Sequence, residues 1–488
     1  MSQILFENKA EIKKALGIYF GAFASLLPGF FFGPYILITW YIVIVAALVY
    51  RKIDYLIIMF IVWNFVGRGA FHYHLLGVDE SHFLIRYINI AMLSASFVLL
   101  IASEKKNLKS LKFFFLFCFG WSSIAFISAM ANNVAAMDFL QYFLIYFRWF
   151  LFALLIFSLK ANKVLFRLLI TLLFVIIGSN GIIAFFQQFV LPVQVTPTGY
   201  IPDYFDLASG LLGVTFSQHL TALSLTCSIY FLIQYFLGQG GFGKFLLFLI
   251  QPFSSSSKAF VIITGMLLVI IFFIALVKGR TDAKLRANKW KFITVALALA
   301  VGIQVYDVIN ENQFGGILAP LENYAQGILD PESVMKLAGY ITSYELVAAN
   351  GRYGVWFGVG PTMFLNVVSS DQKTEFSSLI LRGNENEDLS TVDKQDTETV
   401  ANIGELGIMG LLAQLLTSGY FVVRYLKKAM MDLEVSHRAF CSVILLLATT
   451  TFIFTLYTQA WSVAFYYIPL FVFISAEQTI FETHTEAT

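Results

Sequence analysis

Three ionisable side chains stand inside or beside apolar runs of the sequence. Arg148 lies within the apolar run 141–150, Lys258 follows a proline and four serines, and His219 begins another apolar run. Ionisable groups in such surroundings are energetically expensive, and they usually face water, a cavity or a substrate. These three residues are therefore the first candidates for binding a substrate.

Lys258 has the most informative neighbours. Pro252 and the serines 254–257 interrupt an apolar stretch just before it. Broken helices persist in a membrane only where they line a cavity, and free N–H groups, hydroxyls and an ammonium together suit a phosphate or pyrophosphate. The alternative for Lys258 is a polar turn between two short spans. The alternative for Arg148 is that its side chain only reaches toward the cytoplasmic side of the membrane. The alternative for His219 is a histidine at the membrane interface without a functional role.

Composition indicates which elements must position these residues. The 488-residue chain is 58% hydrophobic and 13% charged, with a mean hydropathy of +0.76, far outside the usage of soluble proteins. A lipid bilayer must therefore be its main solvent. The net charge of +2 indicates no nucleic-acid partner, and all three cysteines fall inside apolar runs, so no disulfide framework is predicted.

We predict an all-α polytopic membrane protein with about fourteen transmembrane helices. A transmembrane helix needs roughly twenty apolar residues, and its backbone N–H and C=O groups must form hydrogen bonds within the helix because the lipid offers none. The expected spans lie near 16–34, 35–50, 54–70, 84–103, 113–131, 139–159, 164–191, 215–237, 244–256, 258–277, 291–306, 403–423, 439–457 and 461–476.

Lys and Arg collect in every second loop between these spans, which predicts that both termini are cytoplasmic. Residues 1–306 would then hold the first eleven spans, and 403–488 the last three with a cytoplasmic tail. Residues 307–402 would form one large periplasmic loop. An amphipathic helix is expected in that loop between Asp330-Pro331 and Asn350-Gly351. Its apolar face would be formed by Val334, Leu337, Ile341, Tyr344 and Ala348.

Several kinds of chemistry have no signature in the sequence. We find no phosphate-binding glycine loop, no paired-cysteine motif and no serine nucleophile elbow, so nucleotide-driven chemistry is not expected. His72 and His74 have no evident further ligands, so we expect no metal and no cofactor. An outward-facing enzyme would instead take an activated group from a lipid-linked donor, such as a polyprenyl-pyrophosphate sugar.

Four segments occur in a fixed order along the chain: Gly213–His219, Ser255–Phe260, Gly351–Pro361 and Glu405–Gly410. They resemble segments of the O-antigen polymerase and O-antigen ligase superfamily, and the resemblance implies a protein of the bacterial inner (plasma) membrane. The four segments cover the region from about residue 205 to 425, including the long outer loop. The third and fourth are the most specific as a pair.

The resemblance implies a metal-independent glycosyltransferase that joins lipid-linked oligosaccharide repeats. Asp396 or Glu398 would orient or deprotonate the acceptor hydroxyl, while Lys258 and Arg352 would neutralise the departing pyrophosphate. Glu405 would belong to the substrate-binding set with Arg148 and His219. For Arg352, a loop arginine paired with a nearby acid is the alternative.

Three departures from the family pattern affect this interpretation. The arginine that often precedes the Gly-Thr-Phe-like segment has no equivalent here, its place falling near Gly210. Where the family usually shows Ser-Arg-Gly-Ala, this chain has Ser257-Lys258-Ala259-Phe260, which keeps the charge but loses the guanidinium fork. Where ligases typically carry a histidine, this chain has Asp396, which favours a polymerase. A ligase of the same architecture and a lipid-linked glycan transporter or flippase remain the alternatives. The expected partners are the polyprenyl-pyrophosphate-linked glycan, membrane lipid and, for a polymerase, a regulator of chain length.

Overall fold

The computed structural model is helical wherever it describes regular structure, so the predicted all-α class is confirmed. It describes residues 9–67, 83–102, 111–159, 162–189, 217–236, 241–254, 343–345, 347–349, 351–361, 398–431, 433, 435–457 and 464–481.

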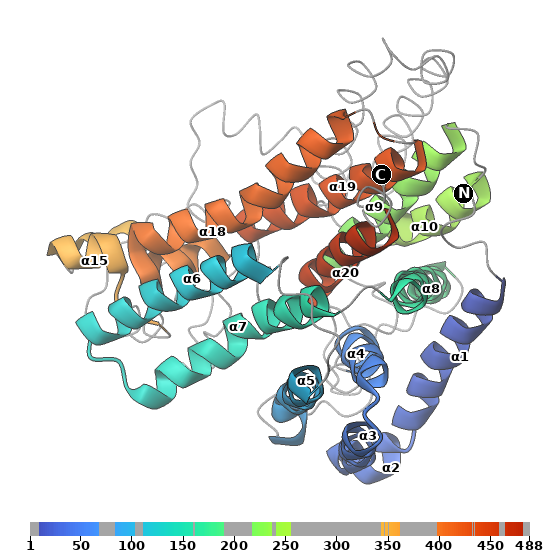
Figure 1. The fold of residues 1–488 in the computed structure, drawn as a ribbon, viewed down its shortest axis with the longest axis horizontal. Coiled ribbons are helices and arrows are strands. Elements are labelled where there is room, and N and C mark those ends of the chain that lie inside the picture. Colours follow the sequence, from blue (N-terminus) through green and yellow to red (C-terminus); the bar gives the residue numbers. More distant parts are fainter. Residues whose placement is uncertain are drawn as a thin grey trace.

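The helices in these residues form a bundle of long, packed elements (Figure 1). The first half contains α1 (Lys9–Leu26), α2 (Gly29–Phe32), the 3-10 helix η1 (Gly33–Ile36), α3 (Leu37–Val49), α4 (Ile53–Val62), the π-helix η2 (Trp63–Gly67), α5 (Phe83–Ala102), α6 (Leu111–Ala131), α7 (Ala136–Ser158), α8 (Lys163–Phe189), α9 (Ser217–Phe236) and α10 (Phe242–Ser254). The second half contains α15 (Gly351–Phe357), α18 (Glu398–Met430), α19 (Val435–Tyr457) and α20 (Ala464–Ile480).

Most of these helices coincide with a predicted span to within a few residues. The closest agreement is at α5, expected at 84–103, and at α6, expected at 113–131. The spans expected at 258–277 and 291–306 lie outside the described residues.

The prediction of one continuous span at 16–34 is wrong. Helix α1 begins earlier, at Lys9, and ends at Leu26, two residues before Pro28. Proline has no N–H to continue the hydrogen-bond ladder. The chain then forms the single turn α2 and reverses at Gly33, whose φ of 59° is readily adopted only by glycine.

The expected amphipathic helix of the outer loop lies largely outside the described residues. Its end is helical at 343–345 and 347–349, but Ser343 and Val347 are the buried positions there. Tyr344 and Ala348, predicted for the apolar face, are exposed. The buried positions there are thus displaced by one residue from the predicted apolar face.

Aromatic residues dominate the centre of the bundle. The ring of Phe174 in α8 contacts Tyr230 and Phe231 in α9, Phe248 in α10 and Phe473 in α20, with ring centroids 5.2–6.0 Å apart. Such contacts between large rings bury much apolar area and favour tilted or edge-on geometry. They connect α20, near the end of the chain, to three consecutive helices of the first half, α8, α9 and α10.

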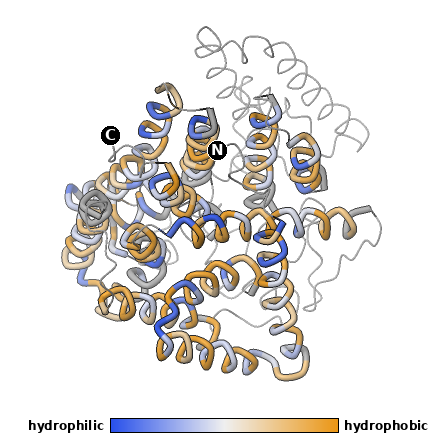
Figure 2. Tube along the Cα trace, turned by 45° about the vertical axis from the view of Figure 1, so that its right-hand side comes forward, coloured by the Kyte–Doolittle hydropathy of each residue, from blue (hydrophilic) through white to orange (hydrophobic). Residues whose placement is uncertain are grey.

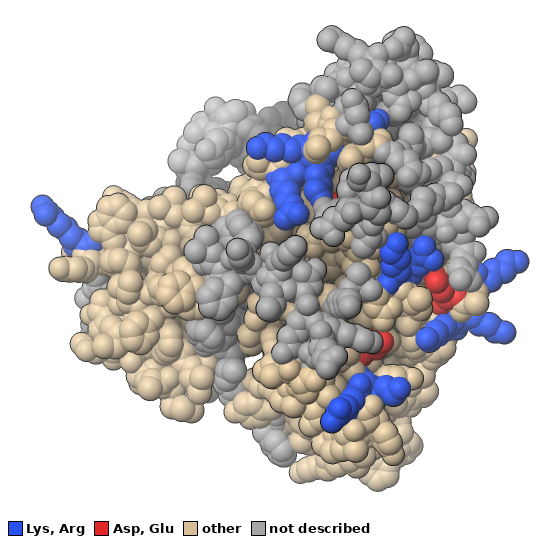
Figure 3. Space-filling model, in the orientation of Figure 1, with Lys and Arg blue, Asp and Glu red and all other residues tan. Residues whose placement is uncertain are grey.

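Apolar residues predominate along most of the described helices (Figure 2), and many large apolar side chains on them are exposed. Two helical stretches in the described residues, Lys163–Phe186 and Asn402–Met430, are long and apolar enough to cross a membrane, whereas the other apolar helices are shorter by this measure. In the view of Figure 3, the described surface at the left, at the end of the bundle that carries α15, shows a basic side chain only at its outer edge, and most of the visible Lys and Arg lie over other parts.

Candidate functional site

The two glycine-rich motifs of the second half lie against each other. After α15, the N–H of Val359 donates to the carbonyl oxygen of Gly404 at 2.8 Å. The N–H of Gly360 donates to the carbonyl oxygen of Glu405 at 3.1 Å. We call this contact between residues 358–360 and 404–407 the glycine junction. It joins the end of α15 to the first turns of α18 through backbone atoms.

Glycine is required on both sides of the junction. Gly358 has φ 71° and Gly407 has φ 65°. A Cβ atom on Gly358 would lie 2.3 Å from the carbonyl carbon of Glu405, and one on Gly407 would lie 2.5 Å from that of Trp356. Both contacts are to backbone, which cannot move aside as a side chain can. The two motifs therefore approach so closely that no side chain fits at Gly358 or at Gly407.

Gly407 also divides α18 into two helical pieces. Its ψ of −158° is not helical, so the ladder of backbone hydrogen bonds is interrupted there. The side-chain amide of Asn402, before this kink, donates to the side-chain oxygen of Gln414 after it at 2.9 Å. This buried contact links the two pieces.

Helix α6 supports the junction from a third direction. The hydroxyl of Ser128 lies within hydrogen-bonding distance of the carbonyl oxygens of Phe357 and Glu405, the latter at 2.8 Å. The side-chain amide of Asn132, one turn later, donates to the carbonyl oxygen of Gly358 at 3.2 Å. Buried carbonyls need such donors, because leaving one unsatisfied is costly.

Ser128→Ala is therefore expected to weaken the junction. Loss of a hydrogen bond to a buried carbonyl costs about 1–3 kcal/mol, so the midpoint of thermal unfolding in detergent should fall. Ser123→Ala is the matched control, since Ser123 is on the same helix and its hydroxyl bonds only the preceding turn, at Phe119. Equal effects of the two substitutions would show that Ser128 does not support the junction.

The structure brings two of the predicted site residues to this junction or beside it. Glu405 lies within it, and its backbone carbonyl accepts bonds from both Ser128 and Gly360. Its side chain is almost buried, at 8% exposure, and substrate binding by that side chain stays a prediction. Arg352 is in α15, six residues before Gly358, and is exposed.

Arg148 lies on a different element. It is in α7 and is half-buried, with its guanidinium carbon 4.5 Å from the ring centroid of the adjacent Trp149. A guanidinium over an indole face is a favourable cation–π arrangement. This contact gives Arg148 a structural partner, and its role in substrate binding stays a prediction.

The other predicted site residues are placed in part or not at all. Glu398 is the first residue of α18, and His219 is in the first turn of α9. Their side chains, and all of Lys258 and Asp396, lie outside the described residues, so their predicted roles stay predictions.

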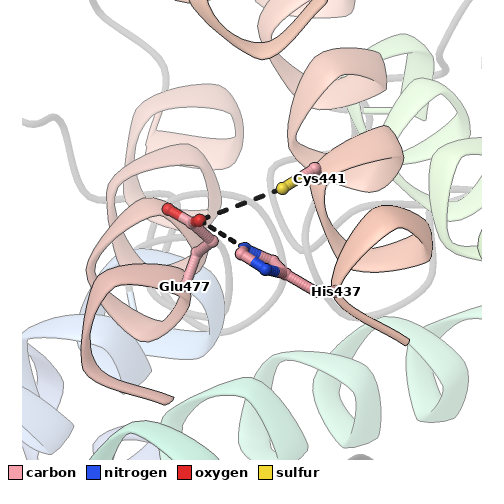
Figure 4. Close-up of side chains that lie close together, drawn as sticks. All are labelled: His437, Cys441 and Glu477. Atoms are coloured by element: carbon pink, nitrogen blue, oxygen red, sulfur yellow. Dashed lines mark hydrogen bonds and ion pairs between the residues drawn. The ribbon is translucent and has the colours of Figure 1, made fainter. Parts of the chain in front are cut away.

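A second polar cluster lies at the other end of α18 and was not predicted from the sequence. It contains His437 and Cys441 of α19 and Glu477 of α20, and their potential ligand atoms lie within 4.8 Å of one another (Figure 4). Glu477 is fully buried. Among the described residues, this is a group that could hold a metal ion.

No protein-family model matches the chain, and no curated protein sequence matches it.

Proposed function

We propose that this chain is a glycosyltransferase of the bacterial plasma membrane that joins polyprenyl-pyrophosphate-linked oligosaccharide repeats into a polysaccharide on the outer face. The proposal rests on the glycine junction. It holds α15, which bears the exposed Arg352, against the first turns of α18, which begins at Glu398. The arginine proposed to bind pyrophosphate and the carboxylate proposed to accept the hydroxyl proton thus belong to two helices that backbone hydrogen bonds hold together.

The reaction needs these two kinds of group. A sugar hydroxyl of the incoming repeat attacks the anomeric carbon of the growing chain, the bond from that carbon to the pyrophosphate oxygen breaks, and the hydroxyl proton passes to a carboxylate. Asp396 or Glu398 would accept this proton. Arg352 and Lys258 would stabilise the negative charge on the departing polyprenyl pyrophosphate. The reaction as written balances without a metal or a cofactor.

The outer surface of the helices supports a location in the membrane. On α3, four large apolar side chains recur at helical spacing and are 48–70% exposed: Ile38, Ile42, Val45 and Val49. On α18, Ile408, Leu412 and Leu416 form a similar exposed row. Contiguous exposed apolar surface is unfavourable in water but suits lipid. In the proposed topology both termini are cytoplasmic and residues 307–402 are periplasmic.

A strain lacking this chain tests the proposal through the length of its surface glycan. We expect single repeats in place of long polymer, and recovery of polymer when the wild-type chain is supplied. Glycans can be separated by gel electrophoresis, and lipid-linked material can be assigned to a leaflet with a membrane-impermeant label. Supply of a chain with the exposed Lys13 changed to Ala is a control for expression and should restore polymer.

The alternatives give different products. Polymer of normal length that stays on its lipid carrier would indicate a ligase. Single repeats confined to the cytoplasmic leaflet would indicate a flippase. Either result would contradict the proposed polymerase.

A further inference from the structure

The buried carboxylate of Glu477 is the centre of the second cluster. Its oxygen Oε1 lies 2.7 Å from Nε2 of His437, 2.9 Å from Nζ of Lys428 and 3.9 Å from Sγ of Cys441. Its other oxygen, Oε2, accepts from Lys428 at 2.9 Å and from the hydroxyl of Tyr425 at 3.3 Å. Three helices, α18, α19 and α20, therefore meet at this carboxylate. Figure 4 shows the side chains from α19 and α20.

The donor atoms have the types and the spacing of a transition-metal site. His437 and Cys441 are four residues apart on α19, so their side chains share one face of the helix. Glu477 approaches from α20. The ring of His437 stacks on Phe481, with centroids 4.4 Å apart and planes 4° apart, which fixes the direction of Nε2. Nitrogen, sulfur and oxygen donors together are typical of zinc.

We propose that His437, Cys441 and Glu477 bind a divalent transition metal of the zinc class. Nε2 of His437, the thiolate of Cys441 and Oε1 of Glu477 would be three ligands of a tetrahedral ion, with water as the fourth. This inference does not rest on the proposed glycosyltransferase, because the cluster and the glycine junction are at opposite ends of α18.

Small movements suffice to form such a site. Tetrahedral zinc with ligand distances of about 2.0 Å to nitrogen and oxygen and about 2.3 Å to sulfur separates neighbouring donors by roughly 3.3–3.6 Å. The contact between His437 and Glu477 would lengthen from 2.7 Å, and that between Cys441 and Glu477 would shorten from 3.9 Å. All three donor atoms already lie within 4.8 Å of one another, so the adjustments are on the order of 1 Å.

The ammonium of Lys428 must move away from Glu477 when the metal binds. Its ammonium now neutralises Glu477, and its side chain is 19% exposed, so it has a path to water. The metal would replace this ammonium, and the thiol of Cys441 would release its proton. One carboxylate and one thiolate then balance the two charges of the ion. The exchange leaves the buried site neutral, which avoids the cost of an uncompensated buried charge.

Cobalt(II) titration of the full-length protein in detergent, after treatment with a chelator, tests the proposal. We expect the absorption bands of tetrahedral cobalt with a thiolate-to-cobalt band, and their loss when zinc is added. Cys441→Ser should remove the thiolate band, whereas Cys227→Ser, at another buried cysteine, should keep it. Lys428→Met should bind cobalt at least about tenfold more tightly, because no ammonium competes. Lys427→Met is its control, since Lys427 is the exposed neighbour.

Each other outcome contradicts the proposal. No thiolate band in the wild-type protein would mean that the cluster is an ion-pair network only, even if Lys428→Met binds cobalt. A thiolate band that survives Cys441→Ser would place the metal elsewhere. Unchanged affinity in Lys428→Met would rule out the exchange with the ammonium. If Lys428→Met does not fold, the two cysteine variants still decide whether Cys441 is a ligand.

Discussion

Replacement of Gly407 by alanine is expected to open the glycine junction and to abolish polymer formation. A side chain at φ 65° and ψ −158°, a backbone region that essentially only glycine adopts, costs about 1–3 kcal/mol by itself. The new Cβ would also lie 2.5 Å from the backbone of Trp356, so α15 must move away from α18. The measurements are the thermal unfolding midpoint in detergent and the glycan length in complemented cells.

Gly419→Ala is the matched control for this substitution. Gly419 is in the same helix, and a Cβ there would meet only the side chain of Phe452 at 4.0 Å, an ordinary contact. Alanine also favours helix more than glycine does, so this variant should keep full activity and normal or slightly raised stability. Normal polymer from Gly407→Ala at a normal protein level would show that the junction is not needed for activity.

Arg352→Ala is expected to abolish polymer formation while leaving the protein folded. The residue is exposed on α15, so its removal leaves no cavity and no buried charge without a partner. Arg352→Lys should be nearly as inactive, because an ammonium cannot reproduce the two parallel bonds of a guanidinium to a phosphate. Glycan length and the affinity of the purified variants for a polyprenyl-pyrophosphate glycan are the measurements.

Two results would give Arg352 a different role. An unfolded or absent Arg352→Ala protein would make the role structural. A folded and active Arg352→Ala protein would show that Arg352 is not needed to bind pyrophosphate. Lys427→Ala is the control, because Lys427 is an exposed basic residue at the opposite end of α18 and should tolerate the change.

The sequence was sufficient to predict most of the helices. Apolar runs and polar breaks gave α5, α6 and α19 to within a few residues, because helix length and the burial of apolar side chains both follow from local composition. The first span failed where Pro28 had been counted inside an apolar run. Hydropathy alone does not register the hydrogen bond that proline removes.

The candidate site could be predicted only in part. The two glycine motifs stand out in the sequence, and the structure brings them together. Ser128 and Asn132 could not be identified, because they bond to backbone carbonyls, which have no residue-type signature, and lie more than 200 residues from Gly358 and Glu405.

The sequence carries a signal for the cluster around Glu477, namely a carboxylate at the end of an apolar run. The last span was expected to end at residue 476, which assigned Glu477 to a solvated tail. Helix α20 continues to Ile480, so the carboxylate belongs to the helix and is buried. An acid within an apolar helix predicts a nearby cation, and Lys428 is that cation.

The length of the helical piece of α18 after Gly407 indicates where the proposed reaction would take place relative to the bilayer. From Ile408 to Lys428 this piece rises about 30 Å at about 1.5 Å per residue, close to the thickness of the hydrocarbon layer. In the proposed topology its kinked end, and α15 with it, would lie level with the lipid headgroups. The exposed Tyr353 and Trp356 of α15 suit that zone. A polyprenyl tail could then stay in the bilayer throughout the transfer, and only the glycan would extend into the aqueous phase.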